Sequence, residues 1–264
     1  MTAVACFTFD NLGEAAEIGS GELAGPRPPG ADPSLAVGYP RLFALLERHA
    51  VRASFFVEGW NGLQHPEAVR EIAERGHELG MHGWLHERWA ELAAEDEARL
   101  ARRATEALER AAGVRPRGFR APGGARSAAT EGVLRALGYR YDASLGSSDR
   151  PALLPSGLAQ VPFRWPHVDG FHYLARKPPS APAAVRDAWL GELARAAREG
   201  GFFLLICHAF LTGVDAERLE ALSAVLAAAQ ADPRVTLRTA GEVAEALLHE
   251  NVTGSRGKGD PAPG

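Results

Sequence analysis

The sequence has little cysteine, no long apolar run and no strong excess of charge. Its two cysteines, Cys6 and Cys207, both lie in apolar segments, which excludes a disulfide framework and favours buried free thiols in a reducing compartment. No stretch reaches the ~18 apolar residues that a membrane-spanning helix needs, and the amino terminus lacks the basic and apolar regions of a signal peptide. We therefore expect a cytoplasmic protein without a membrane partner.

The charge and length of the chain narrow the function classes further. A formal net charge of -4 gives no reason to expect nucleic acid as a partner. Apolar residues make up 46% and charged residues 23% of the 264 residues, which is ordinary for a globular protein that buries a large core. We expect one such domain with a small-molecule substrate, and the oligomeric state stays open.

Short apolar segments alternate with amphipathic ones along the chain. The former predict strands and the latter predict helices. The predicted strands lie at residues 3–9, 52–57, 77–81, 117–120, 139–144, 160–166, 202–207 and 235–237. The predicted helices lie at residues 39–49, 66–76, 91–112, 127–137, 183–199, 215–231 and 239–249. This alternation predicts an α/β protein with a single parallel barrel.

His82 and His86 are four residues apart and follow a short apolar segment. On a helix or in a tight loop this spacing places both imidazoles on one side. Neutral imidazole is a common ligand for zinc, but a catalytic zinc site takes three protein ligands and keeps a further position open. The pair therefore predicts a metal site only if polar residues from elsewhere complete it, and otherwise the two histidines are structural.

Further polar side chains stand at the carboxyl ends of predicted strands. Each of them alone has an ordinary explanation as a helix cap or a turn residue. In a parallel barrel, however, these strand ends meet on one face, which is where such barrels carry their chemistry. The residues expected to converge there are Asp10, Asn11, His82, His86, Arg120, Asp142 and His208.

Four short motifs resemble those of one family, the polysaccharide deacetylases (carbohydrate esterase family 4). Residues 8–11, Thr-Phe-Asp-Asn, resemble its Thr-Phe-Asp-Asp motif, and residues 82–86, His-Gly-Trp-Leu-His, resemble its His-Ser/Thr-x-x-His motif. Residues 120–124, Arg-Ala-Pro-Gly-Gly, resemble its Arg-x-Pro-aromatic-Gly motif. Residues 205–208, Leu-Ile-Cys-His, resemble the late strand that carries the family's catalytic histidine. The motifs come in the family's order, and the resemblance extends over about residues 3–248.

The resemblance implies a fold and a reaction class. It implies an α/β fold with a single distorted (β/α)7 barrel over residues 1–250, which leaves residues 251–264 as a tail that we expect to be disordered. Residues 141–144 and 162–165 look most like the intracellular branch, which holds allantoinase-like, cyclic-imide-hydrolase-like and peptidoglycan-deacetylase-like members. Such proteins hydrolyse an amide, typically an N-acetyl group.

The resemblance also implies roles for the catalytic residues. Asp10 would be the general base that takes a proton from water, and Arg120 would keep Asp10 ionised. His208 would be the general acid that protonates the leaving amine, and Asp142 would orient a catalytic group.

A metal and a substrate pocket are implied as well. Asn11, His82 and His86 would hold a divalent cation that polarises the carbonyl and lowers the pKa of water. Zinc is the expected metal, and cobalt and nickel are the alternatives that suit these donors. The substrate pocket would be walled by Trp84, Pro122 and Trp165.

The chain departs from the family's pattern at three places. Asn11 stands where the family has a metal-binding aspartate, and an uncharged amide oxygen should lower metal affinity. Gly83 removes a small polar side chain between the histidines, and Gly123 or Gly124 takes the place of the pocket aromatic. These changes indicate that the substrate is specialised and that the protein binds a metal weakly or not at all.

Three functions are compatible with these residues. The first is a metal-dependent deacylase of a small N-acylated compound, such as an amino sugar. The second is a metal-independent allantoinase-like or cyclic-amide hydrolase, which Asn11 favours. The third is a degenerate barrel that binds a ligand without turnover, and the joint presence of Asp10, Arg120 and His208 disfavours it.

Overall fold

The strands form one sheet in the computed structural model, which describes residues 2–256. They are β1 (Ala3–Asp10), β2 (Ser54–Val57), β3 (Glu78–Met81), β4 (Gly118–Phe119), β5 (Tyr141–Asp142), β6 (Ala152–Leu153), β7 (Ala159–Gln160), β8 (Phe202–His208) and β9 (Val235–Leu237). Their order is β6-β7-β5-β4-β3-β2-β1-β8, and β9 pairs with β1. All of these pairings are parallel except that of β6 with β7.

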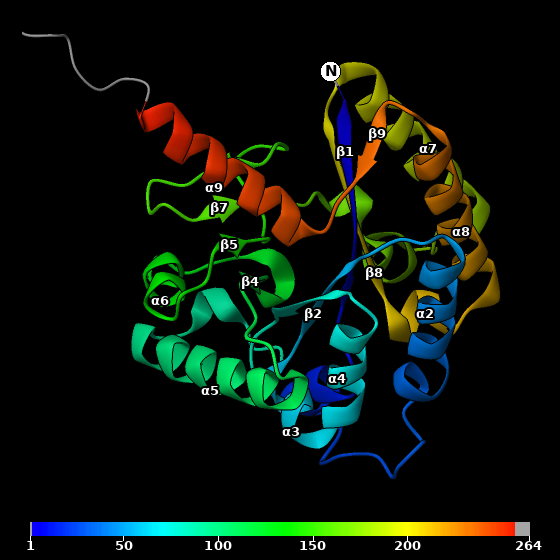
Figure 1. The fold of residues 1–264 in the computed structure, drawn as a ribbon. Coiled ribbons are helices and arrows are strands. Elements are labelled where there is room, and N and C mark those ends of the chain that lie inside the picture. The colour runs from blue at the N-terminus through cyan, green and yellow to red at the C-terminus, as the bar shows by residue number, and fades with distance from the viewer. Residues whose placement is uncertain (1, 257–264) are drawn as a thin grey trace, which may run out of the picture.

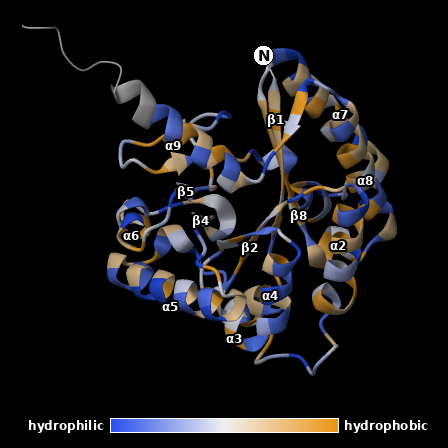
Figure 2. Ribbon diagram, viewed as in Figure 1, coloured by the Kyte–Doolittle hydropathy of each residue, from blue (hydrophilic) through white to orange (hydrophobic). Residues whose placement is uncertain are grey.

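Helices surround this sheet (Figure 1). They are α1 (Ala15–Gly19), α2 (Tyr39–Arg48), α3 (Gly59–Gln64), α4 (Pro66–Glu74), α5 (Ala94–Ala112), α6 (Thr130–Ala136), α7 (Pro182–Glu199), α8 (Ala216–Ala231) and α9 (Ala240–Arg256). Helices α7 and α8 pack on each other, and α5 packs on both α3 and α4. Hydrophilic and hydrophobic residues are mixed along these helices, as expected when one face is buried (Figure 2).

The sheet curls as a half-barrel. Seven parallel strands follow one another in the order β7-β5-β4-β3-β2-β1-β8. A single parallel bridge between Val168 and Ile206 joins the segment after β7 to β8 at the other end of that series. The predicted α/β fold with a distorted barrel is confirmed in this form.

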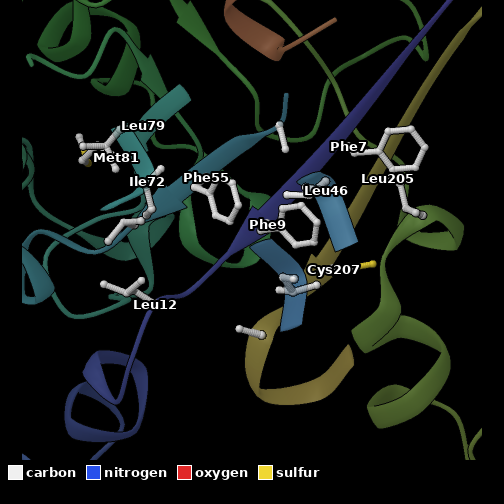
Figure 3. Packing of buried hydrophobic residues seen from close by; sticks show 14 of the residues in the cluster. Phe7, Phe9, Leu12, Leu46, Phe55, Ile72, Leu79, Met81, Leu205 and Cys207 are labelled. Atoms are coloured by element: carbon white, nitrogen blue, oxygen red, sulfur yellow. The ribbon is translucent and has the colours of Figure 1, made fainter. Parts of the chain in front are cut away.

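Strand β1 lies at the centre of the core and is buried on both faces. Phe7 and Phe9 point to the side of β1 where Phe55 of β2 and Leu205 of β8 lie (Figure 3). The rings of Phe9 and Phe55 stack with their centroids 4.9 Å apart. A continuous apolar strand can be buried in this way because both faces of a parallel sheet are covered. The packing fixes β1 against β8 in a register that pairs Asp10 with His208.

A few elements differ from those expected. Helix α3 was not predicted, because its glycines Gly59 and Gly62 weaken the helical pattern; both pack closely on α5, where a side chain would collide. Helix α9 continues to Arg256, six residues into the expected tail, and residues 257–264 lie outside the described part of the chain. No helix in the described range is both long and apolar enough to cross a bilayer.

Candidate active site

Five polar side chains from four strand ends line one cavity of about 660 Å³. Asp10 and His208 are the last residues of β1 and β8, and they are partners in the strand register. His82 directly follows β3, Arg120 directly follows β4, and His86 stands on the loop after His82. The structure therefore brings these five predicted residues together on one edge of the sheet.

Arg120 and Asp10 form a buried ion pair, with 2.6 Å between Arg120 Nη1 and Asp10 Oδ1. The same Nη1 donates to the hydroxyl of Thr8 at 2.9 Å, which fixes the guanidinium. Burial by itself raises the pKa of Asp10, but the positive charge and hydrogen bond of Arg120, together with the nearby His208, outweigh burial and hold that pKa below its usual value. Asp10 is therefore a carboxylate whose orientation is set by Arg120.

His82 and His86 are both neutral imidazoles at neutral pH. Nδ1 of His82 lies 2.8 Å from the carbonyl oxygen of Arg120, and because a carbonyl only accepts, Nδ1 carries the hydrogen and Nε2 keeps its lone pair. Burial lowers the pKa of His82 to about 3, and burial together with the nearby His208 lowers the pKa of His86. The two rings lie 5.0 Å apart between centroids in a T-shaped arrangement.

Gly83 and Glu87 shape the loop between these histidines. The φ of Gly83 is 77°, and a Cβ there would lie 2.8 Å from Oε2 of Glu87. The Glu87 carboxylate accepts the backbone N–H groups of Trp84 at 2.9 Å and Leu85 at 2.8 Å. The serine or threonine of the resembled motif would be strained at this backbone conformation and would displace the Glu87 carboxylate.

Asp169, which sequence reasoning did not select, holds His208. Its Oδ1 lies 2.5 Å from Nδ1 of His208, and its Oδ2 accepts the backbone N–H of His208 at 2.8 Å and the hydroxyl of Thr212 at 2.6 Å. Burial alone would lower the pKa of His208, but the charge and hydrogen bond of Asp169 raise it above its usual value. Asp169 thus favours the protonated form of His208. Its sequence signal was a lone aspartate 39 residues before the histidine.

Asn11 is oriented by Glu58, which follows β2. Nδ2 of Asn11 donates to Oε1 of Glu58, while Oε2 accepts the amide of Asn61 at 2.9 Å and the backbone N–H of Leu12 at 3.3 Å. In this contact Nδ2 of Asn11 faces Glu58, which leaves Oδ1 on the side away from Glu58. Asn11 lines a second cavity, which shares His86 with the first. Sequence reasoning did not select Glu58 either.

The predicted pocket residues divide into one that lines the cavity and two that do not. Trp165 lines the first cavity. Trp84 is buried and packs on Gly59 of α3 and beneath the guanidinium of Arg103, 3.7 Å from its ring centroid. Pro122 is buried beside Gly83. The loop after β3 turns at the left-handed Gly83, which directs Trp84 into the helix layer instead of the cavity.

Asp142 also stands behind the cavity wall. Its Oδ1 accepts the backbone N–H of Ser144 at 3.1 Å and the Ser144 hydroxyl at 2.5 Å, and its Oδ2 lies 2.8 Å from Nη1 of Arg126. The Ser144 hydroxyl in turn accepts the backbone N–H of Ala121, next to Arg120. Asp142 therefore supports the loop that follows Arg120, and no catalytic side chain contacts it directly in this network.

Comparison with known proteins places these motifs in a family. The polysaccharide deacetylase family model matches residues 27–141. A solved structure of a polysaccharide-deacetylase-type protein from Mycobacterium smegmatis is 32% identical, covers 95% of this chain and 91% of that chain, and superimposes with a TM-score of 0.86. The chain belongs to the polysaccharide deacetylase family. The family consists of hydrolases that act on carbon–nitrogen bonds.

Further proteins match a smaller part of the chain or match it at lower sequence identity. The peptidoglycan deacetylase of Helicobacter pylori is 32% identical over 113 residues, which is 43% of this chain and 39% of that protein, so the match spans well under half of the relative. An allantoinase structure covers 96% of this chain and 91% of its own, with a TM-score of 0.80 and 18% identity. At that identity the likeness establishes the fold alone.

The family is typically metal-dependent, and the residues present fit a divalent cation with uncharged donors. His82 keeps Nε2 free, His86 is neutral, and the Asn11 amide oxygen is turned away from Glu58. Within residues 2–256 there is no group of three or more His, Cys, Asp and Glu side chains that could hold a metal. The candidate donors are thus two imidazoles and one amide oxygen, with His82 and His86 in the first cavity and His86 and Asn11 in the second.

Proposed function

We propose that this protein hydrolyses the amide bond of a small N-acyl compound, releasing an amine and a carboxylic acid. The observation that carries the proposal is the pairing of Asp10 with His208 across β1 and β8 at the edge of one cavity. Arg120 favours the carboxylate form of Asp10, and Asp169 favours the imidazolium form of His208, which are the states that a base and an acid need.

Asp10 and His208 perform the two proton transfers of the proposed reaction. Asp10 takes a proton from the water that attacks the carbonyl carbon, and Arg120 keeps the carboxylate aimed at that water. His208 donates its Nε2 proton to the amine nitrogen as the carbon–nitrogen bond breaks, because its Nδ1 is engaged by Asp169. The proton that Asp10 gains and the proton that His208 loses balance over one turnover.

His82, His86 and Asn11 are the residues that would hold a divalent cation. The chemistry that such a cation supplies is polarisation of the carbonyl and a lowered pKa of water. Uncharged donors should bind it more weakly than the family's usual set with its carboxylate.

A second candidate is metal-independent hydrolysis of a cyclic amide, as in an allantoinase-like enzyme. Asn11 favours it, because the neutral amide removes the charge that would hold a cation. In this reaction the neutral His82 and His86 would contact the substrate carbonyl. A ligand-binding barrel without turnover has less support, because the Asp10–Arg120 and His208–Asp169 pairs together supply the base and the acid that hydrolysis needs.

The first test is the metal content of freshly purified protein, followed by zinc titration of the metal-free form. We expect about one equivalent of zinc to bind, and we expect His82→Ala to abolish uptake because it removes a ligand. His49→Ala is the matched control, since His49 is bound to Gln230 and Ser223 far from the cavity.

Hydrolysis of N-acyl amines and of cyclic amides is then measured with and without zinc. Hydrolysis that requires zinc supports the first candidate, and hydrolysis of cyclic amides without zinc supports the second. Failure to hydrolyse either class in both conditions would overturn the proposed function.

A further inference from the structure

The cavity above the catalytic residues has an apolar wall that the hydrolytic chemistry does not require. Phe163, Trp165, Phe171, Leu174 and Phe210 line it, together with small and aliphatic residues. The charged and polar side chains that line the cavity are the five already described at its floor. Its volume of about 660 Å³ is within the range of cavities that enclose small ligands and far exceeds the needs of an acetyl group.

Three of these large apolar side chains are about half exposed to solvent, which is energetically unfavourable. The exposed fractions are 51% for Leu174 and 43% for both Trp165 and Phe210. Large apolar side chains exposed singly are ordinary, but three at the mouth of one cavity form a patch of the kind that contacts a ligand. The other exposed large apolar residues of the described chain, Val37, Leu63 and Val114, do not line this cavity.

This wall stands beside the proton donor. The ring centroid of Phe210 lies 5.2 Å from that of His208. A Cβ on Gly170 would lie 4.0 Å from both Cε1 of His208 and Cδ1 of Leu174, so Gly170 leaves open the space that connects the two side chains. An amine that receives its proton from His208 would therefore carry its substituent along Leu174 and Phe210.

We infer that the amine portion of the substrate carries an apolar group of aromatic size, so that the protein prefers N-acyl arylalkylamines to N-acyl amino sugars. The inference rests on the proposed function for the reaction itself. An aryl group would bury apolar surface on both partners. The hydroxyls of a sugar would lose water against this wall without gaining hydrogen-bond partners from its side chains.

The test compares hydrolysis of N-acetylphenethylamine and N-acetylglucosamine by the full chain and by Leu174→Ser. The native protein should prefer the aryl substrate, and Leu174→Ser should lower kcat/KM for that substrate on the order of tenfold without lowering it for the sugar. Leu63→Ser is the matched control, because Leu63 and Leu174 are the same residue type with the same 51% exposure and Leu63 does not line the cavity.

Binding of N-phenethylmethanesulfonamide, an analogue that cannot be hydrolysed as an amide, is measured by calorimetry in the same three proteins. Binding that weakens only in Leu174→Ser supports the inference even if no substrate is turned over, and the absence of turnover then counts against the proposed function alone. A preference for N-acetylglucosamine, or equal behaviour of Leu174→Ser and the native protein with both aryl compounds, would overturn the inference.

Discussion

Asp10 and Arg120 on the floor of the cavity are buried and hydrogen-bonded, whereas Trp165 and Leu174 on its wall are half exposed. The floor residues stand at the ends of neighbouring strands, where the sheet register fixes their spacing. The wall residues stand on the segments that follow β7 and β8, outside the regular sheet.

This contrast indicates where reaction and selectivity reside. The floor carries the proposed base and acid, so changes there should affect the rate by orders of magnitude, and removal of a buried charge should also lower stability. A half-exposed apolar side chain on a connecting segment can change with little effect on the fold, so changes in the wall should alter the choice of substrate. The following substitutions test the floor residues, from the largest expected effect to the smallest. They complement the Leu174→Ser variant of the wall.

Asp10→Asn should have the largest effect, because it removes the base and keeps its shape. We expect kcat/KM to fall roughly 10²- to 10⁴-fold, as measured by steady-state hydrolysis, and the thermal midpoint to fall as well, because the buried Arg120 keeps its charge without its partner. Asp142→Asn is the matched comparison, since Asp142 is also buried but does not line the cavity. It should lower the thermal midpoint and leave kcat/KM within about tenfold. An Asp10→Asn protein with native activity would refute the assignment of the base.

Asp169→Asn should have the next largest effect. The substitution removes the negative charge that raises the pKa of His208, so this pKa falls and His208 loses its proton at lower pH. The basic limb of the kcat/KM–pH profile, where the acid is lost, should move to lower pH. The rate at neutral pH should fall roughly 10- to 100-fold.

Thr212→Val is the control for Asp169, because it removes one hydrogen bond to the carboxylate but leaves the charge. It should displace the basic limb less than Asp169→Asn does. A slower Asp169→Asn protein whose basic limb has not moved would show that Asp169 supports the local structure without tuning His208.

Asn11→Asp should have the smallest effect on rate and tests the metal site directly. It would bring a second carboxylate against Glu58, whose pKa burial already raises to about 7, so one of the two should bind a proton and zinc affinity should gain little. The double variant Asn11→Asp, Glu58→Gln relieves this repulsion and should bind zinc on the order of tenfold more tightly than the native protein. Zinc competition against a chelator measures both, and equal affinities in the two variants would exclude Glu58 as the residue that controls position 11.

Local sequence pattern located the strands but overestimated the length of several of them. The strands expected at 3–9, 202–207 and 235–237 match β1, β8 and β9 to within one residue. The strands expected at 117–120 and 139–144 contain β4 and β5, and the one expected at 160–166 overlaps β7, but each of these three strands has only two residues. Long elements repeat their pattern often enough to be recognised, whereas two residues carry no period.

The site shows the same division between sequence and tertiary structure. The sequence by itself determined that Asp10, Arg120 and His208 stand at strand ends, because parallel strands deliver their last residues to one edge of the sheet. Only the tertiary structure decided that Asp169 pairs with His208 and that Glu58 pairs with Asn11, across separations of 39 and 47 residues. A buried polar group must find a hydrogen-bond partner, but the distant segment that supplies it is selected by how the whole chain packs.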